Sequence, residues 1–270
     1  MTLPLPLRNR LTDLILDSLH DAEARKGLEA LAAACAHSRA PAGGWPTAFP
    51  ADLFERRGEG VALKSGWRQH AAEFGERAAR AWRAIGVRPL DAADAPLAVA
   101  LAAAGALFDA GLYFEVHEAL EPYWMRAAGD EREALQGLIQ VAVGLQHLAN
   151  GNLGGARALL HDGCVKILGR GLEGLDLEPF ARATQRCLDS VLALGDEAPT
   201  RFDWTSVPRF PRIDRPSPQP SPQRGEGARN SSPQPSPQRE EGARDPSPQP
   251  SPQRGEGARN SSPPEGERAG

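Results

Sequence analysis

The sequence predicts an all-α protein, a multi-helix antiparallel bundle followed by a disordered C-terminal tail. Apolar residues recur at helical spacing through most of residues 1–210, and the segments between the later helical stretches are short. No run alternates apolar and polar residues between hairpin turns, so we expect no strands. The chain of 270 residues is long enough for one or two ordinary domains.

Residues 1–95 are expected to form an N-terminal helical extension that packs on or beside the bundle. Within it, residues 38–60 contain several Pro and Gly residues, which exclude a long helix and allow only a short turn. The helices expected in this region cover about residues 7–19, 22–37 and 65–85.

Residues 96–210 are expected to form the helical bundle itself. Asn152 precedes one of its helices and is a favourable N-cap residue. Residues 202–213 contain three large aromatic residues and are expected to pack on the bundle as an extended strap. The helices expected in the bundle cover about residues 97–109, 113–127, 131–149, 153–169 and 177–194.

The C-terminal segment, residues 211–270, differs in composition from the rest of the chain. It is rich in Pro, Ser, Gln, Arg and Gly, and the octapeptide SPQPSPQR begins at Ser217, Ser232 and Ser247, a period of 15 residues. A repeat without large apolar residues buries nothing when it is stacked, so we expect this tail to be disordered.

Composition excludes several classes of protein. The chain has 31 Lys and Arg against 35 Asp and Glu and no basic stripe with interleaved aromatic residues, so nucleic-acid binding is not expected. No apolar run is long enough to span a bilayer, and the N-terminus has no secretory h-region. The three cysteines form neither a disulfide framework nor a metal knuckle. We therefore expect a soluble cytoplasmic protein with a small-molecule partner or a second copy of itself.

A cluster of ionisable residues lies in the stretch FEVHEALEPYW, residues 114–124. His117 and Glu121 are four residues apart and share a face of the predicted helix, and Glu118 lies beside them. This HExxE pattern differs by one residue from HExxH, which places two zinc ligands and a general base on one helical face. Zn²⁺, Mn²⁺ and Fe²⁺ accept carboxylate together with imidazole. We predict His117 and Glu121 as ligands of a divalent metal ion and Glu118 as the general base of a hydrolase.

The following helix is apolar almost all round, yet it carries a second, polar stripe formed by Gln136, Gln140 and His147. Buried amides and imidazoles cost about 1–3 kcal/mol each unless they are hydrogen-bonded. We therefore expect the stripe to face the HExxE helix, with His147 as third metal ligand and both glutamines lining the site. Arg157, on the helix after that, is a further candidate binding residue.

Two other interpretations remain open at this stage. In the first, Tyr113, Phe114 and Trp124 line a non-catalytic cleft that binds a small cationic or polar ligand or a partner helix. In the second, the polar residues form a closed network that only specifies how the helices pack. Aromatic residues in such helices belong to the core more often than to a ligand site.

The sequence also resembles a known family, domain of unknown function 309, over about residues 97–170. The resemblance rests on GLYFEVHEALEPYW (111–124), on QGLIQ (136–140), on His147, and on the GN..GA pattern that begins at Gly151. It implies a small helical bundle without a settled biochemical activity. The charged residues of the family motif correspond here to Glu115, His117, Glu118 and Glu121. Glu115 thereby joins Glu118 as a candidate catalytic carboxylate.

Overall fold

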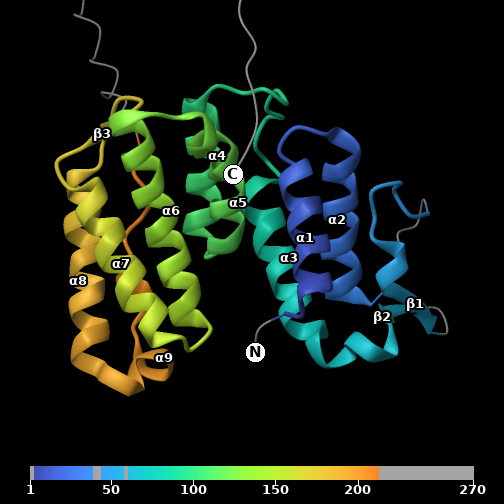
Figure 1. Ribbon diagram of the computed structural model, residues 1–270. Helices are drawn as coiled ribbons and strands as arrows, with labels where there is room; N and C mark the ends of the chain where they lie inside the picture. Colours follow the sequence, from blue (N-terminus) through green and yellow to red (C-terminus); the bar gives the residue numbers. More distant parts are fainter. Residues whose placement is uncertain (1–2, 39–43, 58–59, 213–270) are drawn as a thin grey trace, which may run out of the picture. The chain divides into compact units, whose positions relative to one another are not determined.

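The computed structural model describes residues 3–38, 44–57 and 60–212, which are mostly helical, so the predicted all-α class is confirmed (Figure 1). All of these described residues belong to one compact unit. The predicted disordered tail lies outside the described residues, apart from Pro211 and Arg212. The α-helices are α1 (Leu5–Asp17), α2 (Ala22–His37), α3 (Ala71–Ile85), α4 (Leu97–Asp109), α5 (Tyr113–Arg126), α6 (Gly129–Ala149), α7 (Leu153–Ile167), α8 (Glu178–Leu194) and α9 (Ala198–Arg201).

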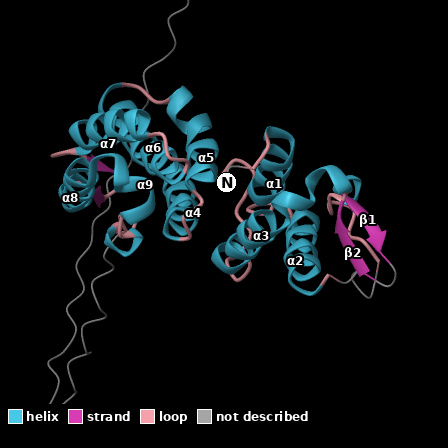
Figure 2. Cartoon of the chain, turned by 90° about the horizontal axis from the view of Figure 1, so that it is seen from below, coloured by secondary structure: helices cyan, strands magenta, loops and turns pink. Residues whose placement is uncertain are grey.

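Helices α1, α2 and α3 pack on one another as an N-terminal group (Figure 2). The helical spacing of their apolar residues buries Leu11, Leu28 and Phe74 completely in a shared core. The helix expected from Ser65 begins with a 3-10 segment, Ser65–His70, and becomes α-helical only at Ala71.

The expectation that the chain contains no strands is wrong at two places. β1 (Phe54–Arg57) pairs with β2 (Gly60–Leu63), and β3 (Gly171–Leu172) pairs with β4 (Leu175–Asp176), both antiparallel. These strands have four and two residues, so the alternation of apolar and polar residues is too short to stand out in the sequence.

Helices α4 to α8 form the bundle, and consecutive helices contact one another along the chain from α4 to α8. α6 and α7 approach most closely at glycines. A Cβ atom on Gly163 would lie 2.8 Å from the carbonyl oxygen of Gly137, and one on Gly144 would lie 2.9 Å from Leu160 Cγ. Because these positions lack side chains, α7 lies directly against the backbone of α6.

The segment after α9, residues 202–212, crosses the bundle as the strap expected from its aromatic residues. Phe210 packs with Phe108 of α4 and Phe180 of α8, with ring centroids 5.6 and 5.9 Å away. Asp109, the last residue of α4, accepts a hydrogen bond from the backbone N–H of Phe210 at 2.8 Å. The strap is therefore held to α4 by both apolar and polar contacts.

The N-terminal group and the bundle meet where α1 contacts α5 and α3 contacts α4 (Figure 2). The predicted boundary near residue 95 falls in the connection between α3 and α4. Within the described ranges, no helix has the combination of length and apolar character that crossing a membrane requires.

Candidate functional site

Helix α5 carries most of the predicted site, and it lies between α4, α6 and α1. Its core face contains Val116 and Leu120, both fully buried. Pro122 lies inside the helix, which nevertheless continues to Arg126. The ionisable residues of α5 that were predicted for the site have two kinds of environment: some are half-exposed, and one is fully buried.

The half-exposed group contains His117, Glu118 and Glu121. Each offers one ligand atom, and these atoms all lie within 4.8 Å of one another. The side chains of His117 and Glu118 are 29% and 33% exposed, and His117 Nδ1 lies 3.1 Å from Glu118 Oε1. One imidazole and two carboxylates, all half-exposed, are ligand types that a divalent cation accepts.

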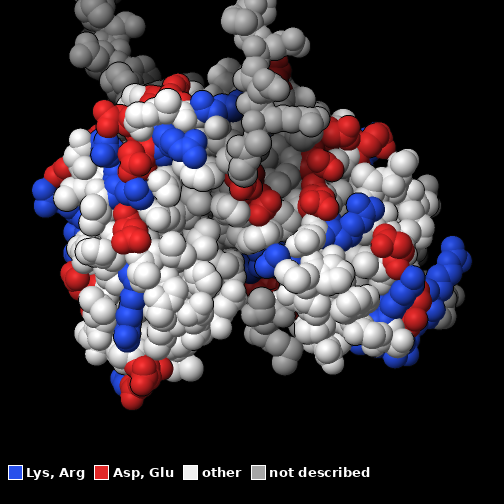
Figure 3. All heavy atoms as spheres, in the orientation of Figure 1, with Lys and Arg blue, Asp and Glu red and all other residues white. Residues whose placement is uncertain are grey.

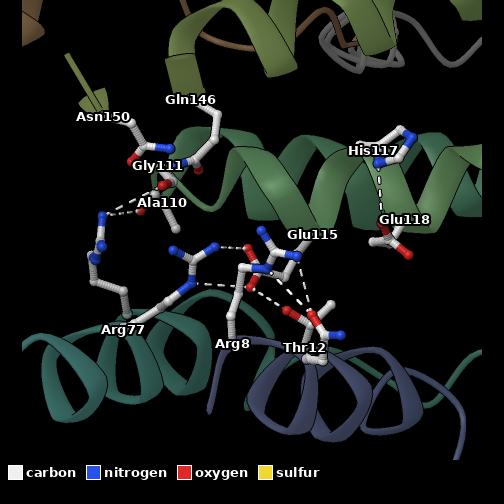
Figure 4. A network of polar contacts seen from close by, with 12 residues as sticks. Arg8, Thr12, Arg77, Ala110, Gly111, Glu115, His117, Glu118, Gln146 and Asn150 are labelled. Carbon is white, nitrogen blue, oxygen red and sulfur yellow. Dashed lines mark hydrogen bonds and ion pairs between the residues drawn. The ribbon is translucent and has the colours of Figure 1, made fainter. Parts of the chain in front are cut away.

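Glu115 belongs to a different environment and does not join this group (Figure 4). Its carboxylate is fully buried and accepts hydrogen bonds from Arg77 Nε at 3.1 Å, Arg77 Nη2 at 2.8 Å and Thr12 Oγ1 at 3.0 Å. Figure 4 shows Glu115 directed at α1 and α3, while His117 and Glu118 lie farther along α5. A carboxylate enclosed in this way cannot contact a substrate from solution, so the structure gives no support to the prediction that Glu115 is catalytic.

The three aromatic residues predicted to line a cleft are engaged in other contacts. Tyr113 is buried and stacks with Trp204, with ring centroids 6.4 Å apart, and burial raises its pKa to about 12. The guanidinium of Arg8 lies 4.1 Å from the ring centroid of Phe114, and that of Arg132 lies 4.2 Å from the ring centroid of Trp124. All three rings therefore already have partners within the fold.

His147 does not lie beside His117, Glu118 and Glu121, contrary to the prediction that it is the third metal ligand. His147 Nδ1 lies 2.9 Å from Asn152 Nδ2, and a Cβ atom on Gly155 would lie 3.0 Å from the His147 ring. His147 therefore lies against the start of α7. Gln136, from the same polar stripe of α6, is half-buried.

The antiparallel arrangement of α5 and α6 gives the physical reason. A two-residue connection, 127–128, joins the helices, so Glu121 lies across from the region near residue 135. At 1.5 Å per residue, His147 is about 18 Å farther along the axis. It cannot share an ion with Glu121 in this structure.

Gln140 and Arg157 are both half-buried, and each has an enclosed polar atom. Gln140 Oε1 and Arg157 Nε have no hydrogen-bond partner among the residues that the structure describes. Arg157 lies on α7, away from the half-exposed group.

Arg8 is near the site and was not predicted from the sequence. It lies over Phe114, and Phe114 is one helical turn before His117 on α5. The only signal for Arg8 was its place on the polar side of the first predicted helix.

The main cavities lie elsewhere. One of about 440 Å³ is lined by α4, the β3–β4 hairpin and the strap, and it includes none of the predicted site residues. The half-exposed group can hold an ion without such a cavity, because a surface ion needs ligand atoms at the right separation rather than a large enclosed volume.

Comparison with known proteins adds one finding. Residues 101–159 match the family described as domain of unknown function (DUF309), and this segment contains most of α4, all of α5 and α6, and the first half of α7. No curated protein and no solved structure matches the chain. The match covers the helix that carries His117, Glu118 and Glu121, and it confirms the resemblance that the motifs indicate. Residues 101–159 of this helical protein are thus similar to the DUF309 family.

Proposed function

We propose that this protein binds one divalent metal ion through His117, Glu118 and Glu121 and uses it for hydrolytic chemistry. The observation that carries the proposal is the convergence of three ligand atoms from one helix within 4.8 Å. Glu118 takes the place first assigned to His147, because it comes from the same turn of α5 as His117. Its assignment changes from general base to third ligand.

The exposure of the group suits a catalytic rather than a structural ion. Structural zinc sites are closed by four protein ligands, whereas catalytic sites use three and keep a position for water. Three half-exposed side chains leave such positions open. A bound divalent ion can lower the pKa of its water to about 7, which supplies a nucleophile at neutral pH.

The surface charge around the middle of the molecule is mixed. In Figure 3, acidic and basic side chains both border the hollow in the middle of the face that Figure 1 shows. The proposal therefore rests on the ligand atoms of α5 and not on the charge of the surrounding surface.

The alternative of a cleft that binds a cationic organic ligand is less well supported. Such a ligand needs an aromatic face, but Arg8 covers Phe114 and Arg132 covers Trp124. The alternative of a closed structural network describes Glu115 well, because that carboxylate is buried and fully hydrogen-bonded. It does not describe the half-exposed group, whose members keep access to water.

Isothermal titration of the metal-free protein with Zn²⁺ and Mn²⁺ tests the proposal. We expect one binding site, lost in His117→Ala and weakened at least tenfold in Glu121→Gln. His161→Ala and Glu131→Gln are matched controls, because both residues are exposed, on α7 and α6 respectively, and lie outside the group. Equal binding by the four variants and the parent protein would refute the metal site.

A second measurement separates the hydrolytic step from binding. The metal-loaded protein is assayed with p-nitrophenyl phosphate and p-nitrophenyl acetate, and any activity should disappear in Glu121→Gln and survive in Glu131→Gln. Stoichiometric binding without hydrolysis of either ester would remove the hydrolase part and leave a metal-binding protein.

A further inference from the structure

Small residues form the outer face of α4, and arginines lie along its border. Two adjoining hollows lie over it. The first, of about 440 Å³, is lined by five residues of α4 between Ala98 and Ala106, by Arg88, by the β3–β4 hairpin and by Arg212. The second, of about 490 Å³, is lined by four arginines and Asp109, together with alanines that include Ala106; the arginines are Arg80, Arg83, Arg209 and Arg212. Because both include Ala106 and Arg212, they form one continuous groove.

The second hollow is strongly basic although the chain as a whole is acidic. Four of its lining residues are arginines, and the one acid among them is Asp109. This carboxylate is only 8% exposed and is already used by the strap, since it accepts the Phe210 N–H and pairs with Arg209 and Arg212. The hollow therefore carries a surplus of about three positive charges by its lining residues.

The arginines of this hollow differ in what they already bind. Arg80 donates to the carbonyl oxygens of Ala110 and Gly111 at the end of α4 and so has a structural task. Arg83 is exposed and makes neither an ion pair nor a hydrogen bond with any residue in the described ranges. Arg209 is 78% exposed and lies 3.6 Å from Asp109. Arg83 is thus free to bind an anion from solution, and Arg209, which is exposed and held only by a long ion pair, can turn toward one.

The first hollow supplies an apolar wall next to this charge. Five of its lining residues are alanine, glycine or leucine of α4, and Leu175 of the β3–β4 hairpin faces them across the cavity. Gly105 cannot gain a side chain, because a Cβ atom there would lie 2.9 Å from the ring of Phe210. The cavity volume is within the range of small-molecule sites.

We propose that this groove binds a small amphipathic anion, with its apolar chain in the first hollow and an oxyanion head, phosphate or carboxylate, at Arg83, Arg209 and Arg212. Arginine presents parallel N–H donors that match both kinds of head. The apolar part distinguishes this site from one for inorganic anions. The proposal does not depend on the α5 metal site, which lies on other residues.

Titration calorimetry on the full chain tests the proposal, with decyl phosphate and decanoate as probes, each below its micelle concentration. Inorganic phosphate and decanol carry only the head or only the chain. We expect at least one amphiphile to bind at a single site about tenfold or more tightly than either half-ligand. Binding of decanol as tight as that of both amphiphiles, or of inorganic phosphate as tight as that of decyl phosphate, would overturn the proposal.

Variants locate the site within the groove. Arg83→Ala combined with Arg209→Ala should reduce affinity for the amphiphile about tenfold or more, since it removes two charged donors. Ala102→Leu should reduce it by filling the apolar hollow, and Ala102 is exposed, so the fold tolerates the change. Arg10→Ala and Ala158→Leu, at exposed helix positions outside both hollows, should bind as the parent does. Unchanged affinity in both groove variants, with native circular dichroism, would place any binding elsewhere.

Discussion

The ion pair between Arg77 and Glu115 makes a sharp prediction about stability. It joins α3 of the N-terminal group to α5 of the helical bundle, and Thr12 of α1 donates to the same carboxylate. The side chain of Arg77 is 8% exposed and that of Glu115 is 0% exposed. Either residue replaced alone leaves a buried charge without its partner.

The size of the effect follows from this burial. Removing one member of a buried pair costs about 3–5 kcal/mol, so Arg77→Met and Glu115→Leu should each lower the free energy of unfolding by that amount. Replacing both members with apolar residues of similar size is often nearly neutral. In the double variant the Thr12 hydroxyl still loses its acceptor, which costs about 1–3 kcal/mol. The double variant should therefore be more stable than either single one.

Urea unfolding followed by far-ultraviolet circular dichroism measures these free energies, and the slope against urea should stay constant. Arg182→Met is the matched control. Arg182 pairs with Glu178 one turn away on α8 and is 66% exposed, so its replacement should cost less than about 1 kcal/mol. The reasoning fails if Arg77→Met costs no more than Arg182→Met, or if the double variant costs the sum of the two single ones.

Further predictions concern the α6–α7 contact and a buried thiol. Gly163→Ala should lower the free energy of unfolding by about 1–3 kcal/mol, because the added Cβ would lie 2.8 Å from the carbonyl oxygen of Gly137. In the control Gly154→Ala the added Cβ meets nothing closer than 3.9 Å, so this change should stabilise the protein slightly. Equal melting temperatures of the two variants would contradict the close approach of α6 and α7. Asn152→Ala removes the cap that accepts the Gly155 N–H at 3.0 Å, and chemical denaturation should show a loss of about 1 kcal/mol. Burial raises the pKa of Cys164 from its ordinary value of 9.0 to about 12, so its contribution to stability is complete below pH 9 and is lost as pH rises toward 12. Unfolding curves against pH should show this decline, and Cys164→Ala should reduce it; the same decline in both proteins would refute the assignment.

The fold class and most helix positions are readable from the sequence, because apolar spacing reports which face of each helix is buried. α7 begins directly after Asn152, whose side chain caps it as its position predicts. The β1–β2 pair was missed because each strand has only four residues and β1 contains two Arg, and short strands depend on their packing context.

The candidate site was predictable only within one helix. His117, Glu118 and Glu121 are close because helical geometry alone brings them together. The prediction for His147 considered which faces of α5 and α6 are polar but not how far apart the residues lie along the helix axes. The short connection between α5 and α6 fixes that distance. The partners of Glu115 lie 38 and 103 residues away along the chain, and nothing local in the sequence indicates such pairing.

The most direct test of the central claim is a crystal structure of the protein soaked with Zn²⁺, with an anomalous difference map calculated at the zinc absorption edge. The metal proposal predicts one peak about 2.0–2.2 Å from a ring nitrogen of His117 and a carboxylate oxygen of Glu121. A zinc peak bound only by other residues, or no peak beside α5 at saturating zinc, would contradict it.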